Sequence, residues 1–263
     1  IKTGYAYQLN PIQFAENKRS DGYINFGPRS FSYPIKKGIV TDWNEFEEMT
    51  QYIYKYRISF EPSEQPVIIS ESPFNTKKDR EKMAQFFFET LRVPSFCLIP
   101  QPHLSLLATG KTSGLVFNMG YESSYAVPIY EGLCPQHSII TQNFGSCDIS
   151  NYLSKSLSLE HRSTRNNNDL MERYCYVALD YDYELNKSKT TSDCIVHTKN
   201  NIVINSERFN SPEIYFKPYI NGFKDQAISN IILNSIYRCE NNWQISLLNN
   251  IVLSGGPSMF NGL

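Results

Sequence analysis

The chain has 263 residues, 41% of them hydrophobic, and its 25 basic and 26 acidic side chains leave a net charge of −1. This apolar content is ample for one large or two moderate folded domains, and it excludes a wholly disordered chain. A near-neutral charge gives no general attraction for nucleic acid or for a membrane surface. No apolar run approaches the ~18 residues of a membrane span, and no signal peptide opens the sequence. We therefore expect neither direct nucleic-acid binding nor membrane association.

The six cysteines are scattered along the chain, with no Cys-x-x-Cys pair. This arrangement is typical of reduced thiols in the cytosol or nucleus rather than of a disulfide framework. The four histidines show no i, i+4 pairing, so a zinc site is not expected. We accordingly assign no metal ligands.

Strands and helices alternate through the first hundred residues. The first six residues have strand character with no preceding turn or methionine, which suggests a piece of a longer chain. Asp42 is predicted to cap a helix, with Glu45 three residues on as a capping box. The apolar stripe of this helix is predicted to comprise Phe46, Met49, Ile53 and Tyr56. A short buried strand over 67–69, a second helix from about Thr76 and a strand over 96–99 follow.

Gln101 is predicted to lie at the mouth of the next helix. It stands between Pro100 and Pro102, and proline is favoured at the first helical position because it has no N–H to leave unpaired there. The helix is expected to run to about Thr109. This rhythm of strand and helix predicts a parallel or mixed sheet covered by helices, so the fold class is α/β.

A strand-turn-strand unit lies near the middle of the chain. Leu115 to Phe117 is predicted to be a buried strand, Gly120 breaks it, and a second strand is predicted over 124–129. A tight turn of this kind can aim several backbone N–H groups at one point and hold a phosphate, although most such units hold nothing.

The remaining elements follow this unit. In chain order we predict a helix from Asp148, a polar loop over 160–168, a helix capped by Asp169 and Glu172, a hairpin over 194–205 turning at Lys199-Asn200, a helix over 225–237, and a strand over 250–253. The last strand runs into Ser254-Gly255-Gly256. Glycines after a strand let backbone approach a ligand closely, although they also end helices.

Several stretches of the sequence resemble the actin family, and they occur in family order. The stretch Tyr33-Pro34-Ile35-Lys36-Lys37-Gly38-Ile39-Val40-Thr41-Asp42-Trp43 is similar to the family's Tyr-Pro-Ile-x-x-Gly-Ile-Val-Thr-Asn-Trp. Residues 75–90, 127–132, 175–179 and 253–256 are similar as well, so the resemblance spans nearly the whole chain. It implies the actin/Hsp70/sugar-kinase-like fold, two α/β halves with ATP and magnesium in the cleft between them. The small half would be 1–108 and the large half 109–263, each incomplete.

The resemblance also implies roles for single residues. Gln101 matches the glutamine that places the attacking water, a role that suits a helix mouth, and it is the candidate catalytic residue. The candidate nucleotide-binding residues are Lys2 after the first phosphate loop, Gly120 in the second, Glu172 near the adenosine, and Gly255, Gly256 and Met259 in the loop under the nucleotide. Simpler interpretations stand beside these: Gln101 can merely cap a helix, and Met259 can be part of the core.

The central turn departs from the family pattern. The family's second phosphate loop reads Asp-Ser-Gly-Asp-Gly, followed by a histidine, whereas residues 118–122 read Asn-Met-Gly-Tyr-Glu and Tyr125 stands for the histidine. Asn118 removes an anionic ligand of the metal's water shell. Glu122 adds a side chain where backbone must approach closely and where φ is expected to be positive.

Three functions are compatible with these residues. The first is a structural actin-related protein, a subunit of a cytoskeletal or chromatin-associated assembly with other protein subunits, actin or actin-related proteins among them. Its ATP site would be degraded, with negligible hydrolysis. The second is an actin-type protein that binds ATP and forms filaments, and the third is a small-molecule kinase on the same fold. We favour the first, placed in the cytoplasmic cytoskeleton or the nucleus, because the second needs a carboxylate and a phosphate-binding turn that are altered here.

Overall fold

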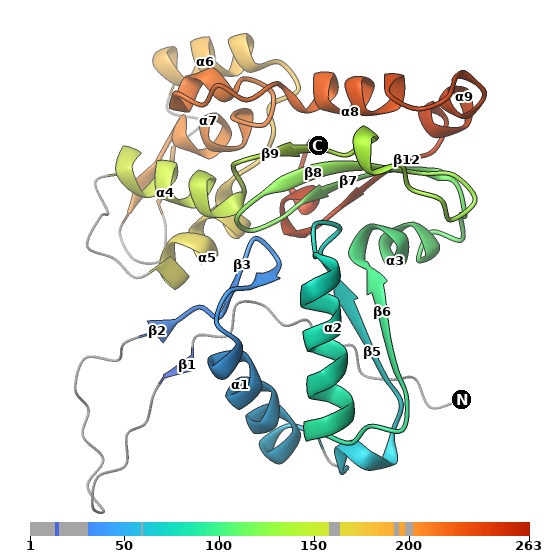
Figure 1. Ribbon diagram of the computed structural model, residues 1–263. Helices are drawn as coiled ribbons and strands as arrows, with labels where there is room; N and C mark the ends of the chain where they lie inside the picture. Colours follow the sequence, from blue (N-terminus) through green and yellow to red (C-terminus); the bar gives the residue numbers. More distant parts are fainter. Residues whose placement is uncertain (1–13, 16–30, 59, 158–163, 192–194, 198–201) are drawn as a thin grey trace, which may run out of the picture. The chain divides into compact units, whose positions relative to one another are not determined.

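The structure is a computed structural model of the chain, and it describes residues 14–15, 31–58, 60–157, 164–191, 195–197 and 202–263 (Figure 1). The chain divides into two compact units, Ile1–Gln101 and Pro102–Leu263. Each unit has a hydrophobic core of its own. The predicted boundary between two halves, after residue 108, stays a prediction.

The first unit is built on two parallel strands, β5 (Val67–Glu71) and β6 (Phe96–Pro100). Helices α1 (Trp43–Tyr56) and α2 (Lys77–Gln85) supply half of its buried core residues, and the chain after α2 supplies the other half. The core comprises Phe46, Met49, Met83, Phe86, Phe87 and Val93. Its short elements are β1 (Phe14–Ala15) paired with β2 (Phe31–Ser32), β3 (Ile35–Lys36) paired with β4 (Ile39–Val40), and η1 (Pro62–Glu64).

The helix caps of this unit differ from the prediction in one respect. Asp42 caps α1 as predicted, because its Oδ1 accepts the Glu45 N–H at 3.1 Å. The reciprocal half of the predicted capping box is wrong, since the Asp42 N–H donates instead to the Pro34 carbonyl oxygen at 3.2 Å. A complete capping box occurs at α2, where Thr76 and Asp79 each accept the other's N–H.

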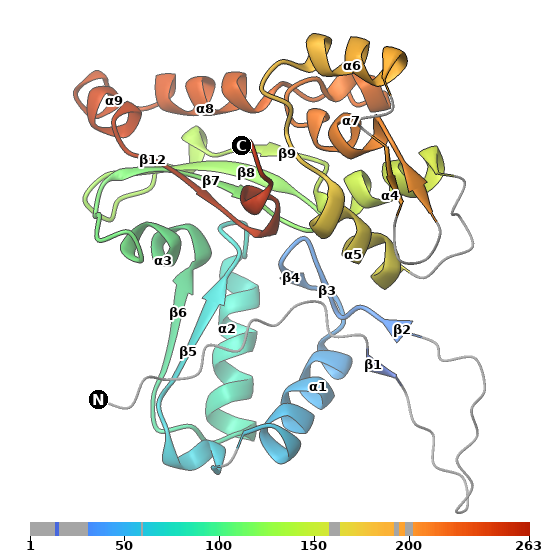
Figure 2. The same ribbon diagram turned by 180° about the vertical axis from the view of Figure 1, so that it is seen from behind.

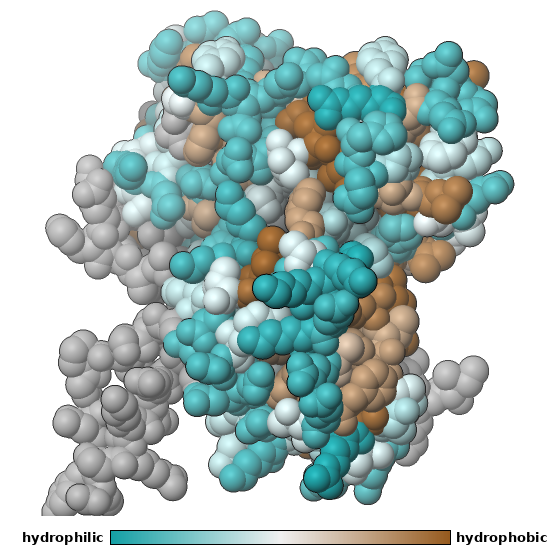
Figure 3. Space-filling view, viewed as in Figure 1, coloured by the Kyte–Doolittle hydropathy of each residue, from teal (hydrophilic) through white to brown (hydrophobic). Residues whose placement is uncertain are grey.

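The apolar stripe of α1 is shorter than predicted. Tyr56, in the last turn of the helix, is 60% exposed, and its ring lies against Tyr52 with 4.7 Å between centroids. The chain after α2 continues as the π-helical turn η2 (Phe86–Thr90), which buries the adjacent rings of Phe86 and Phe87. The outward side of α2 is hydrophilic (Figure 3) and carries Lys78, Glu81 and Lys82.

The second unit is built on a four-stranded mixed sheet in the order β12-β7-β8-β9. Strands β7 (Gly114–Met119), β8 (Ser124–Ile129) and β9 (Ile140–Gln142) are antiparallel neighbours, and β12 (Ile251–Ser254) lies parallel to β7. The predicted mixed sheet and the predicted bounds of β8 are confirmed. Helices α8 (Ile228–Tyr237) and α9 (Asn241–Leu248) pack along one face of this sheet (Figures 1 and 2).

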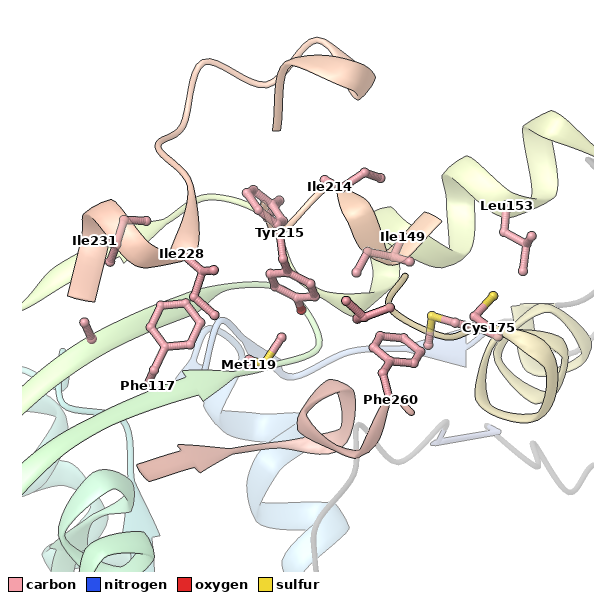
Figure 4. Packing of buried hydrophobic residues seen from close by; sticks show 14 of the residues in the cluster. Phe117, Met119, Ile149, Leu153, Cys175, Ile214, Tyr215, Ile228, Ile231 and Phe260 are labelled. Carbon is pink, nitrogen blue, oxygen red and sulfur yellow. The ribbon is translucent and has the colours of Figure 1, made fainter. Parts of the chain in front are cut away.

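The core of this unit fills the helix-covered face of the sheet. Phe117 and Met119 of β7 are fully buried there, together with Ile149 of α4 (Ser146–Ser156) and with Tyr215, which follows α7 (Glu207–Glu213) (Figure 4). Successive side chains of a strand point to opposite faces, so Val116 and Asn118 lie on the other face of the sheet.

Two predictions in this unit need comment. Helix α5 (Thr164–Tyr174) begins inside the predicted polar loop, so Asp169 lies within the helix and its predicted capping role is wrong. Its buried side chains Leu170 and Met171 pack into the core and offset the weak helix propensity of the asparagines before them. The predicted hairpin is confirmed as β10 (Val196–His197) with β11 (Val203–Ile204), and its turn lies outside the described residues. The other elements are α3 (Gln101–Leu107), α6 (Tyr181–Thr190), η3 (Gln136–Ser138), η4 (Pro218–Asn221) and η5 (Gly256–Met259).

Candidate functional site

The turn between β7 and β8 is the centre of the candidate site. Strand pairing sets Asn118 opposite Tyr125 and Met119 opposite Ser124, which leaves residues 120–123 as the turn. The Gly120 N–H donates to the Ser123 carbonyl oxygen at 3.1 Å. A Cβ on Gly120 would lie 2.5 Å from this same oxygen, so the turn needs glycine for its own geometry.

The carbonyl oxygens of this turn serve helix α4. The oxygens of Gly120 and Tyr121 accept the N–H groups of Ser146 and Cys147, at 3.0 and 2.9 Å. These are the first two N–H groups of α4, which have no partner within the helix. The carboxylate of Asp148 accepts the N–H of the residue before the helix at 3.0 Å. The described hydrogen bonds of the turn thus cap a helix, a role that the phosphate-nest interpretation did not include.

Asn118 lies at the end of β7 and is joined to the end of β12. Its Oδ1 accepts the hydroxyl hydrogen of Ser254 at 3.1 Å. Its Nδ2 is 3.4 Å from the place that a Cβ would take on Gly120. A carboxylate offers two negatively charged acceptor oxygens to a metal-bound water, whereas this amide offers one neutral oxygen, which already accepts from Ser254, and its Nδ2 can only donate. Asn118 therefore does not fit a magnesium water shell as a carboxylate would.

Glu122 brings negative charge to the turn without backbone strain. Its predicted positive φ is wrong: among the described residues other than glycine, positive φ occurs at Lys37, Arg92 and Glu131. Burial, with a smaller contribution from the nearby carboxylates of Asp148 and Glu122, raises the pKa of the Cys147 thiol to about 12. Two carboxylates therefore lie near Cys147, whose N–H donates to the turn, and negative charges of this kind repel a phosphate.

The loop after β12 packs against the same strand end. Gly255 has φ 92° and ψ 165°, a conformation that is essentially restricted to glycine. A Cβ at this position would overlap the Met119 carbonyl oxygen, whereas a Cβ on Gly256 would meet open space. Met259 is 83% exposed, so its alternative interpretation as a core residue is wrong.

The chain was also compared with models of protein families. A family model described as Actin matches residues 14–168 and 160–263. The chain belongs to the actin family. The predicted resemblance and the α/β, actin/Hsp70/sugar-kinase-like fold class are thereby confirmed. Actin-family proteins typically bind nucleotide, so the remaining candidate residues are compared below with that role.

The other candidate positions of this actin-family chain are spread over several elements. Glu172 is exposed on α5, and its neighbour Met171, where the family has a basic residue, is buried in the core. Tyr125, which stands for the family's histidine, is 5% exposed, and burial raises its pKa so that it remains a neutral phenol. Gln101 is the exposed first residue of α3, as predicted, and belongs to the first unit. Lys2 lies outside the described residues.

Magnesium with ATP is the cofactor that the family implies, and the turn residues do not fit it. Within the described ranges, no group of three or more His, Cys, Asp or Glu side chains is placed to hold a metal ion. The structure brings two candidate residues of the second unit together at the end of β7, since Gly120 follows Met119 and Gly255 packs on Met119, whereas Glu172 lies on α5. Ser254, which the sequence interpretation missed as the partner of Asn118, could have been inferred only from the pairing of β12 with β7.

Proposed function

We propose that this actin-family chain acts as a structural subunit of a larger protein assembly, with a degraded nucleotide site and negligible ATP turnover. The observation that supports this most directly is the altered turn between β7 and β8. The side-chain oxygen of Asn118 accepts a hydrogen bond from Ser254, and Glu122 adds a negative charge to the turn. No step of ATP hydrolysis is assigned to these residues.

The size of the expected loss follows from simple electrostatics. A carboxylate at ~5 Å from a phosphate charge, at an effective dielectric near 20, costs about 3 kcal/mol before screening. That free energy corresponds to roughly 10²-fold in affinity. Loss of one preorganised polar group commonly costs ~10²-fold in rate, and Gln101 alone does not replace the aspartate and histidine that the family has where Asn118 and Tyr125 stand.

The partners and location belong to the same proposal. We propose other protein subunits as partners, with actin or actin-related proteins among them, and neither nucleic acid nor a membrane. A net charge of −1 supports this. Among the described helices, none is both long and apolar enough to cross a membrane. The proposed location is the cytoplasmic cytoskeleton, with a nuclear assembly as the second possibility.

An ATP-binding, filament-forming protein is the second candidate function. The position of Gln101 favours it, because this side chain is exposed at the start of α3, where the family's glutamine places the attacking water. The two candidates differ in one measurable property, which is ATP turnover by the full-length protein.

The test compares full-length protein with a variant in which the family's residues are restored. Asn118→Asp with Glu122→Gly keeps an acceptor for Ser254 and removes the added charge. We expect this double variant to bind magnesium-ATP roughly 10²-fold more tightly than the parent in titration calorimetry. The matched control, Asn151→Asp with Glu131→Gly, changes an exposed residue of α4 and a turn at the far end of β8, and should leave binding unchanged. ATP turnover by the unmodified protein at an ordinary actin's rate, abolished by Gln101→Ala, would overturn the proposal.

A further inference from the structure

Two segments of the second unit lie side by side in opposite directions. One is the loop between β8 and β9, and the other joins α8 to α9. At one end the ring of Tyr130 stacks on that of Trp243, with 4.9 Å between centroids and 8° between planes. At the other end the Ser235 hydroxyl donates to the Ser138 carbonyl oxygen at 2.7 Å. The two segments are therefore fastened at both ends.

Two reciprocal contacts also join the segments between these ends. A ring nitrogen of His137, Nε2, lies 3.1 Å from the Arg238 carbonyl oxygen. In return, Arg238 Nη1 donates to the His137 carbonyl oxygen at 3.4 Å. Such reciprocal bonds fix the register of the two segments relative to each other.

This register places two cysteines opposite each other. Cys134 is four residues from each fastened end of its loop, and Cys239 is four residues from each fastened end of its own segment. Cys239 is 7% exposed, and its Sγ–H donates to the Ser235 carbonyl oxygen at 3.5 Å. Cys134 is partly exposed, and the two thiols are close enough that Cys239 raises the pKa of Cys134. Both are free thiols in the structure.

We propose that Cys134 and Cys239 are a redox-modification site, a thiol pair that closes to an intramolecular disulfide when the protein meets a disulfide oxidant such as oxidised glutathione. The more accessible thiolate, that of Cys134, attacks one sulfur of the oxidant and releases the first glutathione thiolate. The thiolate of Cys239 then attacks the Cys134 sulfur of the mixed disulfide and releases the second. The protein is oxidised by two electrons, the oxidant is reduced by two, and the two thiol protons pass to the released glutathione.

The disulfide would hold the β8–β9 loop against the end of α8. Cys134 precedes Pro135 in an irregular stretch and Cys239 follows the last turn of α8, so both lie outside regular structure, and bond formation brings the sulfurs to about 2.05 Å. Burial raises the pKa of Cys134 to about 11. Few thiolates are then present at neutral pH, so the exchange is slow and is followed over hours at about pH 8.5.

The experiment uses the full-length protein with Cys97→Ser, which removes the exposed thiol of β6 in the other unit. The protein is incubated with oxidised glutathione, free thiols are alkylated, and an unreduced digest is analysed by mass spectrometry. We expect a linked peptide pair containing Cys134 and Cys239. We also expect a rise in Tm on the order of 10 °C, because the bond closes a loop of about 100 residues, and reversal of this rise by dithiothreitol.

Matched variants separate the pair from the other thiols. Cys134→Ser, at the partly exposed position, should abolish both the linked peptide and the rise in Tm. Cys147→Ser, which removes another partly buried thiol of the same unit, should abolish neither. Glutathione left on Cys134 without a link, or a link between any other two cysteines, would overturn the proposal. The peptide analysis of the parent decides the question even if a variant folds poorly, and neither result bears on ATP binding.

Discussion

Replacing Gly255 by alanine is expected to loosen the junction between β12 and β7. The residue has φ 92° and ψ 165°, which a side chain strongly disfavours. The added methyl group would also overlap the carbonyl oxygen of Met119, the last residue of β7. Because Met119 is fully buried, the strand end has little room to move away.

The expected magnitude is the sum of two costs. Holding a residue other than glycine in this backbone region costs about 1–3 kcal/mol. Relieving the overlap by shifting packed backbone adds roughly 1–3 kcal/mol. For a protein of this size each kcal/mol lowers Tm by about 2–4 °C, so Gly255→Ala should lower Tm by roughly 10 °C.

Gly256→Ala is the matched control. Its added methyl group would meet open space, and its φ lies outside the positive region, so its stability should stay within about 0.5 kcal/mol of the parent. Thermal unfolding followed by circular dichroism measures both variants. Equal Tm values for the two variants would refute the structural role given to Gly255. A loss of ATP affinity in Gly256→Ala at unchanged Tm would show instead that the loop holds nucleotide.

Two further predictions concern the ionisable groups. Arg80→Met leaves the Glu71 carboxylate, whose side chain is 4% exposed, without its ion pair at 2.9 Å. We expect this variant to lower the free energy of unfolding, measured with guanidinium, by about 2–4 kcal/mol, a cost that is limited because Arg80 itself is half exposed. Lys77→Met breaks an exposed ion pair and should lower the free energy of unfolding by less than about 0.5 kcal/mol. Burial raises the pKa of Cys147 and of Cys175 from 9.0 to about 12. The unfolded chain therefore loses these protons first, so the contribution of the two thiols to stability should be constant well below pH 9 and should fall between about pH 9 and 12. A rise in stability over that range would contradict the burial of both thiols.

The central hairpin could be predicted from the sequence because local signals determine it. The apolar run Leu115 to Phe117, a glycine that permits a tight turn and a largely apolar partner strand over 124–129 together predict a hairpin. The structure confirms the bounds of β8, and its observed register sets Asn118 opposite Tyr125 with Glu122 in the turn. The predicted position of Gln101 at the start of a helix is also confirmed. This prediction rests on a local signal, because proline is favoured in the first turn of a helix.

The features that the sequence did not predict depend on distant contacts. The Asn118–Ser254 bond joins residues that are 136 positions apart, and it exists only because β12 pairs with β7 in parallel. The N–H of Asp42 donates to the carbonyl oxygen of Pro34, the residue before β3, and the capping rules for α1 do not include this contact. The early start of α5 likewise follows from the burial of Leu170 and Met171 rather than from the propensity of the asparagines.

The glycines and the polar side chains of the candidate site carry different information. Gly120 is needed by its own turn and Gly255 by its packing on Met119, so both would be required in this fold whether or not a nucleotide binds. Their agreement with the family's phosphate loops therefore supports the fold and does not support ATP binding. The hairpin forms although the residues at three positions, Asn118, Glu122 and Tyr125, differ from those of the family. The fold therefore does not require the family's residues at these positions. These three side chains are positions of the turn where the chain differs from the family's phosphate-loop sequence, and the double variant Asn118→Asp with Glu122→Gly tests whether the first two decide nucleotide binding.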